Sequence, residues 1–348
     1  MRIGVICPSE IAFRRFMPAL QKVNDLEFVG LGVCTKEERF GSGYPDEVTV
    51  EKVLREEYEK AQKFIKLYGG KIFEGYEMIV SSNEIDALYI PLPPSLHYKW
   101  AKRALEAGKH VLVEKPSTIS AEQSKDLVRI ANKRNLALHE NYMFIFHNQI
   151  EAIEKLITNG EIGDIRLYRI SFGFPMRGEN DFRYNKALGG GALIDAGGYT
   201  IKYATRLLGE TAKLEYAVLN FIDGMDVDMY GSAALTNNEN VTVQIAFGMD
   251  NNYKCELEAW GSKGCLSTGR ILTAPADFIP MLNIRKGNVD EQISLPEDDA
   301  FKKSIEHFIK CIDDKETRKR NCSAIIKQAK MVEEFRMMAE RQTAMGVG

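Results

Sequence analysis

Several patterns that indicate metal or membrane chemistry are missing from this 348-residue sequence. Its six cysteines include no C-x-x-C pair, so we expect neither a zinc site nor a disulfide framework. The five histidines show no H-x-x-x-H or H-E-x-x-H spacing, so no metal site is predicted. No apolar run is long enough to span a bilayer, and residues 1–10 lack the zones of a signal peptide. We therefore expect a cytoplasmic protein that does not bind membranes.

An excess of positive charge is also missing. The formal net charge is -3, from 46 basic and 49 acidic side chains, which gives no general attraction to nucleic acid. Hydrophobic residues make up 45% and charged residues 27% of the chain, as in ordinary globular proteins. The length suits two domains better than one, so we expect a site at a domain junction.

The first part of the chain alternates short apolar runs with longer amphipathic stretches, which predicts βαβ units. We expect a doubly wound, mostly parallel α/β sheet in a dinucleotide-binding Rossmann domain over residues 1–140. The predicted strands are Arg2–Ile6, Glu27–Val33, Ala87–Ile90, His110–Val113 and Leu136–His139. The predicted helices are Ile11–Lys22, Val50–Leu67, Ser95–Ala107 and Ala121–Arg134.

The second part of the chain has several strand patterns in succession without helices between them. This order predicts a large, mainly antiparallel sheet, hence an α+β domain over residues 141–348 for substrate binding and oligomerisation. The predicted strands are Ile165–Phe172, Lys213–Phe221, Gly231–Leu235, Val241–Met249 and Lys254–Trp260. The predicted helices are Gln149–Asn159, Asp299–Asp313 and Ser323–Arg341.

The turn after the first strand lacks the glycines of the G-x-G-x-x-G/A pattern that binds a pyrophosphate. It reads Cys7-Pro8-Ser9-Glu10-Ile11-Ala12, in which only Ala12 keeps the small residue needed for close packing of helix and strand. By itself this turn favours a plain strand-to-helix connection. In a cofactor-binding turn, Cys7 would be tolerated if its φ were negative, whereas a bulkier residue would crowd the pyrophosphate.

The second strand ends without the acidic residue that binds the ribose of NAD. Thr35 and Lys36 follow it instead, and a hydroxyl beside an ammonium group suits the 2′-phosphate of NADP. An ordinary polar turn remains the alternative.

A strand that ends on Glu114-Lys115-Pro116 is the more specific feature. It brings Lys115 to the carboxyl edge of the sheet, where open α/β sheets bind their ligands, and a lysine there suits acid/base catalysis. Taken alone, the tripeptide more often contains a surface lysine.

The segment from Leu188 to Tyr199 contains five glycines and runs into a helix. Glycines there allow a close approach of the backbone to a ligand, and Asp195 and Tyr199, four residues apart, share one helix face. The alternative is a buried, hydrogen-bonded tyrosine with a helix-capping aspartate.

Together these residues resemble the glucose-fructose oxidoreductase/inositol dehydrogenase/MocA (Gfo/Idh/MocA) family over nearly the whole chain. The segments that carry the resemblance are RIGVICPSEIA, EIDALYIPLPPSLHYKWAKRALEAGKHVLVEKP and GGGALIDAGGYTIKYATRLLG. The resemblance implies that Lys115 and Asp195 match the family's catalytic lysine and aspartate. Many members carry histidine where this chain has Tyr199, and the tyrosine looks most like the branch that reduces the 3-keto group of nucleotide-linked deoxyhexoses with NADPH.

From this resemblance we expect an NADP(H)-dependent oxidoreductase that acts on a sugar or sugar nucleotide and forms a homodimer or homotetramer. In the hypothesis, Tyr199 protonates the developing alkoxide, Lys115 activates the phenol, and Asp195 orients the pair. Arg183 and Lys202 are weaker candidates for substrate contact, and each could equally form a salt bridge. The expected cofactor-binding residues are Cys7, Ser9, Glu10, Ile11, Ala12, Thr35, Lys36, Pro91, Leu92, Pro93, His97, Glu114 and Lys115.

Three other functions stay open at this stage. A dehydrogenase of free sugars or polyols would share Lys115 and Asp195. An NAD-dependent glycosidase would use its cofactor without net turnover. A non-catalytic NADP-binding protein would explain the irregular first turn.

Overall fold

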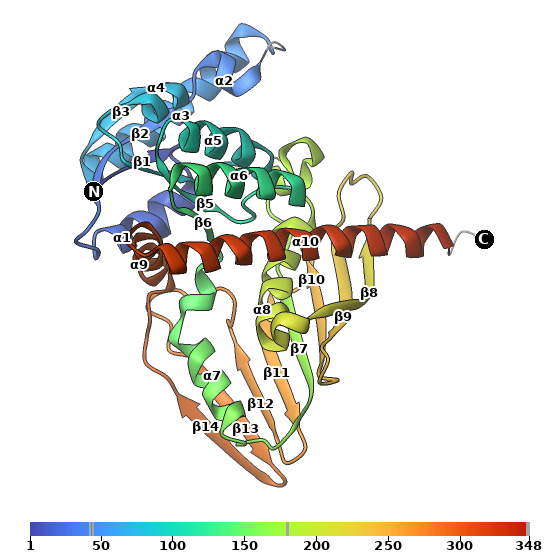
Figure 1. Cartoon of the computed structure of the whole chain (residues 1–348). Coiled ribbons are helices and arrows are strands. Elements are labelled where there is room, and N and C mark those ends of the chain that lie inside the picture. Colours follow the sequence, from blue (N-terminus) through green and yellow to red (C-terminus); the bar gives the residue numbers. More distant parts are fainter. Residues whose placement is uncertain (42, 44, 179–180, 346–348) are drawn as a thin grey trace. The chain divides into compact units, whose positions relative to one another are not determined.

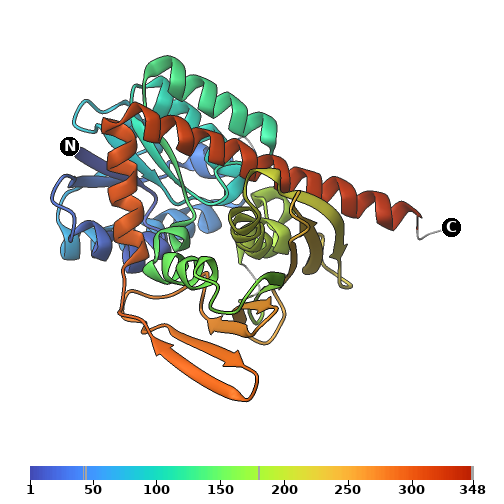
Figure 2. The same ribbon diagram turned by 60° about the horizontal axis from the view of Figure 1, so that its bottom comes forward.

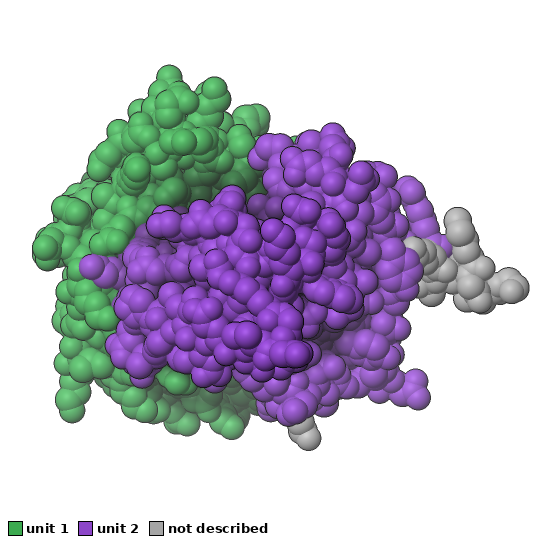
Figure 3. All heavy atoms as spheres, turned by 90° about the horizontal axis from the view of Figure 1, so that it is seen from below, with its two compact units in different colours: residues 1–118, 122–141, 304–326 green, residues 119–121, 142–303, 327–348 purple. Residues whose placement is uncertain are grey.

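The protein is described by a computed structural model that covers residues 1–41, 43, 45–178 and 181–345. The chain divides into two compact units, which have different colours in Figure 3. Unit 1 comprises residues 1–118, 122–141 and 304–326, and unit 2 comprises residues 119–121, 142–303 and 327–348. None of the described helices combines the length and the apolar composition that crossing a bilayer requires.

Unit 1 contains a six-stranded sheet in the order β3-β2-β1-β4-β5-β6, and every pair of neighbours is parallel (Figure 1). Strand β4 reads Ala-Leu-Tyr-Ile and is completely buried, which is typical of a parallel strand covered on both faces. The predicted doubly wound parallel sheet is therefore confirmed. Its strands are β1 (Arg2–Ile6), β2 (Glu27–Val33), β3 (Lys71–Glu74), β4 (Ala87–Ile90), β5 (His110–Glu114) and β6 (Leu138–Asn141).

The helices of unit 1 follow the predicted alternation, with two additions. Helices α2 and α4 were not predicted, and neither was the short strand β3 that precedes α4. The helices are η1 (Ala12–Phe16, a π-helix), α1 (Met17–Leu20), α2 (Lys36–Phe40), α3 (Glu47–Tyr68), α4 (Tyr76–Ser81), α5 (Pro94–Glu106) and α6 (Ala121–Arg134).

A late part of the chain returns to unit 1. Helices α9 (Ala300–Asp313) and α10 (Lys315–Met345) contribute residues 304–326. The Asn321 side-chain amide donates to the carbonyl of Leu138 at 2.6 Å, and Arg318 donates to the Asn135 side chain at 2.7 Å. The division into functional domains at residues 140 and 141 stays a prediction, but it did not anticipate this return.

Unit 2 contains an eight-stranded sheet in the order β14-β13-β12-β11-β7-β10-β9-β8, and its outer hairpin stands out in Figure 2. Only the β7–β10 pair is parallel, which confirms the predicted mainly antiparallel sheet. The last three strands in the chain were not predicted. The strands are β7 (Ile165–Gly173), β8 (Lys213–Asn220), β9 (Tyr230–Thr236), β10 (Thr242–Gly248), β11 (Lys254–Gly261), β12 (Cys265–Gly269), β13 (Met281–Lys286) and β14 (Val289–Ser294).

One face of this sheet is buried and the other is not. Ile170, Ile245 and Leu257 point to the buried face, where α8 packs on β7 and β10. The helical segments of unit 2 are η2 (Met143–Phe146), α7 (Asn148–Thr158), η3 (Phe182–Tyr184), η4 (Lys186–Leu188), η5 (Leu193–Gly197, a π-helix), α8 (Gly198–Leu208) and η6 (Gly209–Thr211).

Candidate functional site

The turn after β1 has the backbone conformation that glycine usually supplies. Cys7 has a φ of 81°, in the left-handed region that costs an L-residue about 1–2 kcal/mol. A negative φ, the condition under which Cys7 would be tolerated in a cofactor-binding turn, is therefore not met. The Cys7 amide nevertheless donates to the carbonyl of Gly32 at 3.1 Å, which holds the turn against β2.

The rest of this turn suits a bound pyrophosphate. The Ser9 hydroxyl accepts a hydrogen bond from the Ala12 amide at 3.2 Å, and Ala12 is fully buried. Glu10 and Ile11 lie in the first helical turn, where backbone amides have no partner inside a helix and favour an anion. Burial raises the pKa of the Cys7 thiol to about 12, so the thiol adds no negative charge beside a phosphate.

Replacing Cys7 with glycine is expected to stabilise the protein by about 1 kcal/mol, because glycine adopts positive φ without steric cost. Thermal and urea unfolding measure this change. Cys7→Ala is the matched control, since it removes the thiol but keeps the Cβ atom and the strain. Equal stabilisation by glycine and alanine would show that the backbone conformation is not the cause.

An acidic side chain does approach the end of β2, but it comes from helix α3. The carboxylate of Glu57 accepts from the Cys34 amide at 2.8 Å, from the Cys34 thiol at 3.1 Å and from the Tyr76 hydroxyl at 3.0 Å. Glu57 is only 9% exposed. This carboxylate is therefore engaged inside the protein and is not presented as a partner for a ribose hydroxyl.

Thr35 and Lys36 lie at the start of helix α2. The Thr35 hydroxyl accepts from the Glu38 amide at 3.2 Å, and the Glu38 carboxylate accepts from the Thr35 amide at 2.9 Å, forming a capping box. As an acceptor in this bond, the Thr35 hydroxyl keeps its own proton for donation. Arg39, one turn further on, is exposed and adds a second cation to this end of the sheet.

Lys115 directly follows β5, is half-buried and lies at the carboxyl edge of the unit 1 sheet. The preceding carboxylate, Glu114, accepts from the Tyr89 hydroxyl at 2.7 Å and from the Asn141 side-chain amide at 2.6 Å. Burial raises the pKa of Glu114, while these two donors oppose the rise. The segment that carries Lys115 is thus fixed from β4 and β6.

His97 connects the two loops on the proposed nicotinamide side. It is completely buried, with Nδ1 at 2.7 Å from the carbonyl oxygen of Pro116 and Nε2 at 2.6 Å from that of Leu92. Burial lowers the pKa of His97 to about 4, so the ring stays neutral. Direct contact of His97 with a cofactor stays a prediction. In this geometry the His97 ring supports the loop Pro91–Pro93.

In unit 2, Asp195 is held by an arginine that is itself mostly buried. The Arg183 Nε donates to Asp195 at 2.6 Å, and its Nη1 donates to Asp181 at 3.0 Å. The side chains of Arg183 and Asp195 are 17% and 11% exposed, so this is not a surface ion pair. Asp181 had not been singled out from the sequence.

The glycine-rich segment packs against protein groups. A Cβ atom at Gly190 would lie 2.3 Å from the carbonyl oxygen of Arg183, and one at Gly191 would lie 2.4 Å from the Asp228 carboxylate. Asp228 also accepts from the Leu193 amide at 2.6 Å. Close packing around Arg183 and Asp228 thus requires glycine at these two positions, and the expected approach of this segment to a ligand stays a prediction.

Tyr199 lies at the start of α8, directly after the π-helical turn η5 that carries Asp195. Its ring contacts those of Tyr142, Phe172 and Phe144, with centroids 5.3, 5.4 and 5.7 Å away. These contacts fix the ring, which is 8% exposed. π-Helical turns frequently occur at functional sites, and η1, which follows the turn at Cys7, is a second one among the described residues.

Lys202 is placed one turn beyond Tyr199, with its ammonium nitrogen 5.4 Å from the centre of the Tyr142 ring. This geometry is a cation–π contact. All predicted cofactor residues belong to unit 1, whereas Arg183, Asp195, Tyr199 and Lys202 belong to unit 2.

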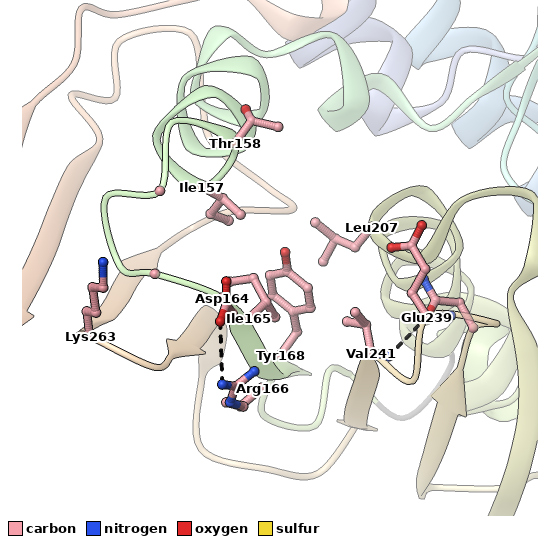
Figure 4. A pocket seen from close by; sticks show the side chains of 13 residues that line it. Ile157, Thr158, Asp164, Ile165, Arg166, Tyr168, Leu207, Glu239, Val241 and Lys263 are labelled. Atoms are coloured by element: carbon pink, nitrogen blue, oxygen red, sulfur yellow. Dashed lines mark hydrogen bonds and ion pairs between the residues drawn. The ribbon is translucent and has the colours of Figure 1, made fainter.

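A separate hollow of about 670 Å³ opens in unit 2 between the end of α7 and the start of β7 (Figure 4). Tyr168 points into it, and Asp164 pairs with Arg166 at 3.6 Å on its wall. It contains none of the residues singled out from the sequence.

Comparison with known proteins decides the family. Residues 25–142 match the family model of the oxidoreductase family with an NAD-binding Rossmann fold, and residues 150–267 match the Gfo/Idh/MocA C-terminal domain. The chain belongs to the Gfo/Idh/MocA family. This membership confirms the predicted resemblance and fold.

The Gfo/Idh/MocA members most relevant here are sugar-nucleotide reductases. The dTDP-3,4-didehydro-2,6-dideoxy-α-D-glucose 3-reductase of Actinomadura kijaniata is 35% identical, with 97% of this chain and 95% of the relative covered. The corresponding enzyme of Streptomyces violaceoruber is 34% identical with the same coverage. A crystal structure of the Actinomadura kijaniata 3-ketoreductase with NADP and TDP-benzene has a TM-score of 0.88 and covers 97% of both chains.

Proposed function

We propose that this protein uses NADPH to reduce the 3-keto group of a nucleotide-linked deoxyhexose. The observation that carries the proposal is the similarity to 3-reductases of a dTDP-linked keto sugar over 97% of the chain. The buried pair of Asp195 and Arg183 beside Tyr199 supports it, because these groups suit the oriented transfer of one proton.

The residues divide the chemistry between them. NADPH, when bound, supplies the hydride. Tyr199 gives its phenolic proton to the oxygen that becomes negative, and a phenol, which keeps its proton at neutral pH, suits reduction better than oxidation. Lys115 stabilises the negative charge on that oxygen, and Asp195 orients the donor.

Arg183 has a narrower role in this proposal than binding a diphosphate. Two carboxylates already balance its charge, so the group of three carries a net charge of about -1 and does not attract a dianion. Its Nη2 has no hydrogen-bond partner among the described residues. We assign it to a neutral sugar oxygen.

The proposed preference for NADP rests on the residues at the end of β2. Glu57 is turned inward there, which leaves Thr35, Lys36 and Arg39 to bind the 2′-phosphate. Lys36→Ala is expected to lower kcat/KM for NADPH about ten- to hundredfold, since a hydrogen bond to a charged group contributes about 1.5–3 kcal/mol. NADH kinetics should change little. Steady-state assays with both cofactors measure the ratio, with the exposed Lys66→Ala on α3 as control. Equal losses with NADPH and NADH would remove Lys36 from phosphate recognition.

We also propose a cytoplasmic homodimer or homotetramer that pairs through the outer face of the unit 2 sheet. Trp260 and Tyr216 are 52% and 47% exposed there, between the small and polar side chains of Ala234 and Gln244. All six cysteines are free, as in the reducing cytoplasm. Sedimentation equilibrium should give at least twice the chain mass, and Trp260→Asp should weaken the assembly. A monomer at micromolar concentration would contradict this proposal.

An NADPH-consumption assay separates the proposal from its alternatives. We expect turnover with dTDP-3,4-didehydro-2,6-dideoxy-α-D-glucose and little with the free keto sugar. Turnover of free sugars alone would indicate a sugar or polyol dehydrogenase, and product release without loss of NADPH would indicate a glycosidase. A thermal shift with NADP but no turnover of any sugar would indicate a binding protein.

A further inference from the structure

We propose that Arg270, on the loop after β12, binds the diphosphate of the substrate and thereby determines the preference for a nucleotide-linked sugar over a free sugar. The inference rests on the proposed function and deepens it, because it names the residue that recognises the charged part of that substrate. All residues that carry it belong to unit 2.

The charge of Arg270 is not balanced by a neighbouring acid. Its side chain is exposed and has no carboxylate partner among the described residues, and Asp277 on the same loop forms no ion pair with it. The arginines on the strands of this sheet are each paired with a carboxylate. These pairs are Arg166–Asp164, Arg169–Glu258 and Arg285–Asp290. Since Arg183 is also balanced, the guanidinium of Arg270 is the cation that this loop offers to an anion.

Two aromatic rings hold the Arg270 guanidinium. Its central carbon lies 5.1 Å from the centroid of the Tyr253 ring and 5.9 Å from that of the Phe278 ring. The Tyr253 hydroxyl lies 3.1 Å from the Thr273 hydroxyl, which fixes the first ring to the loop. Contact with ring faces leaves the N–H donors at the edge of the guanidinium for the oxygens of a phosphate.

The backbone of the loop is anchored although the side chain is exposed. Arg270 has a φ of 48°, in the left-handed region that non-glycine residues adopt where the surrounding structure imposes it. The fully buried Gln149 side chain donates to the carbonyl of Arg270 at 3.4 Å and to that of Ile271 at 3.5 Å. Residues held in such conformations cluster at ligand-binding sites, and here the conformation directs a long cation outward.

The loop lies on the same face of the sheet as Tyr199. The Tyr199 ring contacts that of Phe172, and Phe172 pairs with Cys255 across β7 and β11. Paired residues of an antiparallel ladder point to one face, and both of these side chains are buried. The Cys255 thiol accepts from the Leu272 amide and the Thr273 hydroxyl, each at 3.4 Å. The loop therefore packs against the strand beside the one that Tyr199 contacts.

This position suits the proposed substrate. The keto group at carbon 3 faces Tyr199 in the proposed reaction, whereas the diphosphate is attached to carbon 1 and lies further out, towards a neighbouring loop. Arg177, on the loop after β7, contributes a second cation there, 5.1 Å from the centroid of the Phe174 ring. The Phe174 carbonyl accepts from the Asn251 amide at 3.1 Å, which joins this loop to the segment that carries Tyr253. Positive charge on adjoining loops attracts a dianion.

Binding of dTDP tests the assignment without turnover. In titrations of the complex with NADP, Arg270→Gln is expected to raise the Kd for dTDP about ten- to hundredfold, because hydrogen bonds to a charged group are lost. The Kd for NADP should stay the same. Arg270→Lys keeps the charge but not the planar fork, so it should raise the Kd for dTDP less.

Arg169→Gln is the matched control. Arg169 is also exposed and lies over an aromatic ring, that of Trp260, but Glu258 balances its charge. This variant should bind dTDP as the wild type does. A Kd for dTDP that is unchanged in both Arg270→Gln and Arg270→Lys would overturn the inference and leave the proposed function intact.

Kinetics show whether Arg270 acts on binding or on the chemical step. In Arg270→Gln, the KM for dTDP-3,4-didehydro-2,6-dideoxy-α-D-glucose should rise about ten- to hundredfold with kcat nearly unchanged, as loss of uniform binding does. A lower kcat at an unchanged KM would contradict diphosphate recognition. A wild-type enzyme that does not bind dTDP at all would contradict the nucleotide-linked substrate itself, which is failure of the proposed function.

Discussion

Replacing Lys115 with alanine is expected to lower kcat for reduction of the dTDP-linked keto sugar by at least a hundred- to ten-thousandfold. Lys115 is half-buried at the carboxyl edge of the unit 1 sheet, next to the fixed carboxylate of Glu114. In the proposed mechanism, its removal deprives the developing oxyanion of a charge and the proton donor of an activating cation. Steady-state NADPH consumption measures the loss.

The control for this variant is Lys125→Ala, which removes an exposed lysine from α6 of the same unit. It should behave as the wild type. The affinity of Lys115→Ala for NADPH, measured by thermal shift, should differ from that of the wild type by no more than a few-fold. The loss of kcat then lies in the chemical step. A Lys115→Ala enzyme that keeps more than about a tenth of the wild-type kcat would exclude the catalytic role.

Replacing Tyr199 with phenylalanine is expected to lower kcat about a hundred- to ten-thousandfold, the usual contribution of a positioned proton donor. Phenylalanine keeps the ring contacts with Tyr142, Phe144 and Phe172, so the fold and cofactor binding should not change. Single-turnover measurements at saturating NADPH separate this loss from product release.

Tyr203 offers a matched control one turn further along α8. Its hydroxyl is buried without a hydrogen-bond partner among the described residues, so Tyr203→Phe removes the same atom at no cost in polar contacts. It should keep full activity. If Tyr199→Phe were as active as Tyr203→Phe, another group would have to supply the proton.

Most of the Rossmann fold could be predicted from local patterns. Strands β1, β2 and β4 have the predicted bounds, because each is a short apolar run between turn residues. Strand β3 was missed because its four residues begin and end with charged side chains, as an edge strand permits. Helix α10 begins eight residues before its predicted start at Ser323, since the charged stretch from Lys315 has no apolar periodicity.

Residues of the candidate site that stand in a sequence motif could be predicted. Residues that long-range packing brings to the site could not. Lys115, Asp195 and Tyr199 stand in recognisable segments. Glu57 accepts a hydrogen bond from the amide of Cys34, which lies 23 residues earlier in the chain. No local sequence pattern connects the two residues. Ser304 reaches Asn141 across 163 residues. The positive φ of Cys7 is imposed by the turn and is not readable from the residue type.

The most direct test of the proposed reaction is to follow the hydride itself. NADPH carrying deuterium at the transferable position is incubated with the enzyme and dTDP-3,4-didehydro-2,6-dideoxy-α-D-glucose, and the product is examined by NMR and mass spectrometry. We predict one deuterium per product molecule, bound to carbon 3 of the sugar. Consumption of the substrate without deuterium in the product, or deuterium at another carbon, would contradict the assignment.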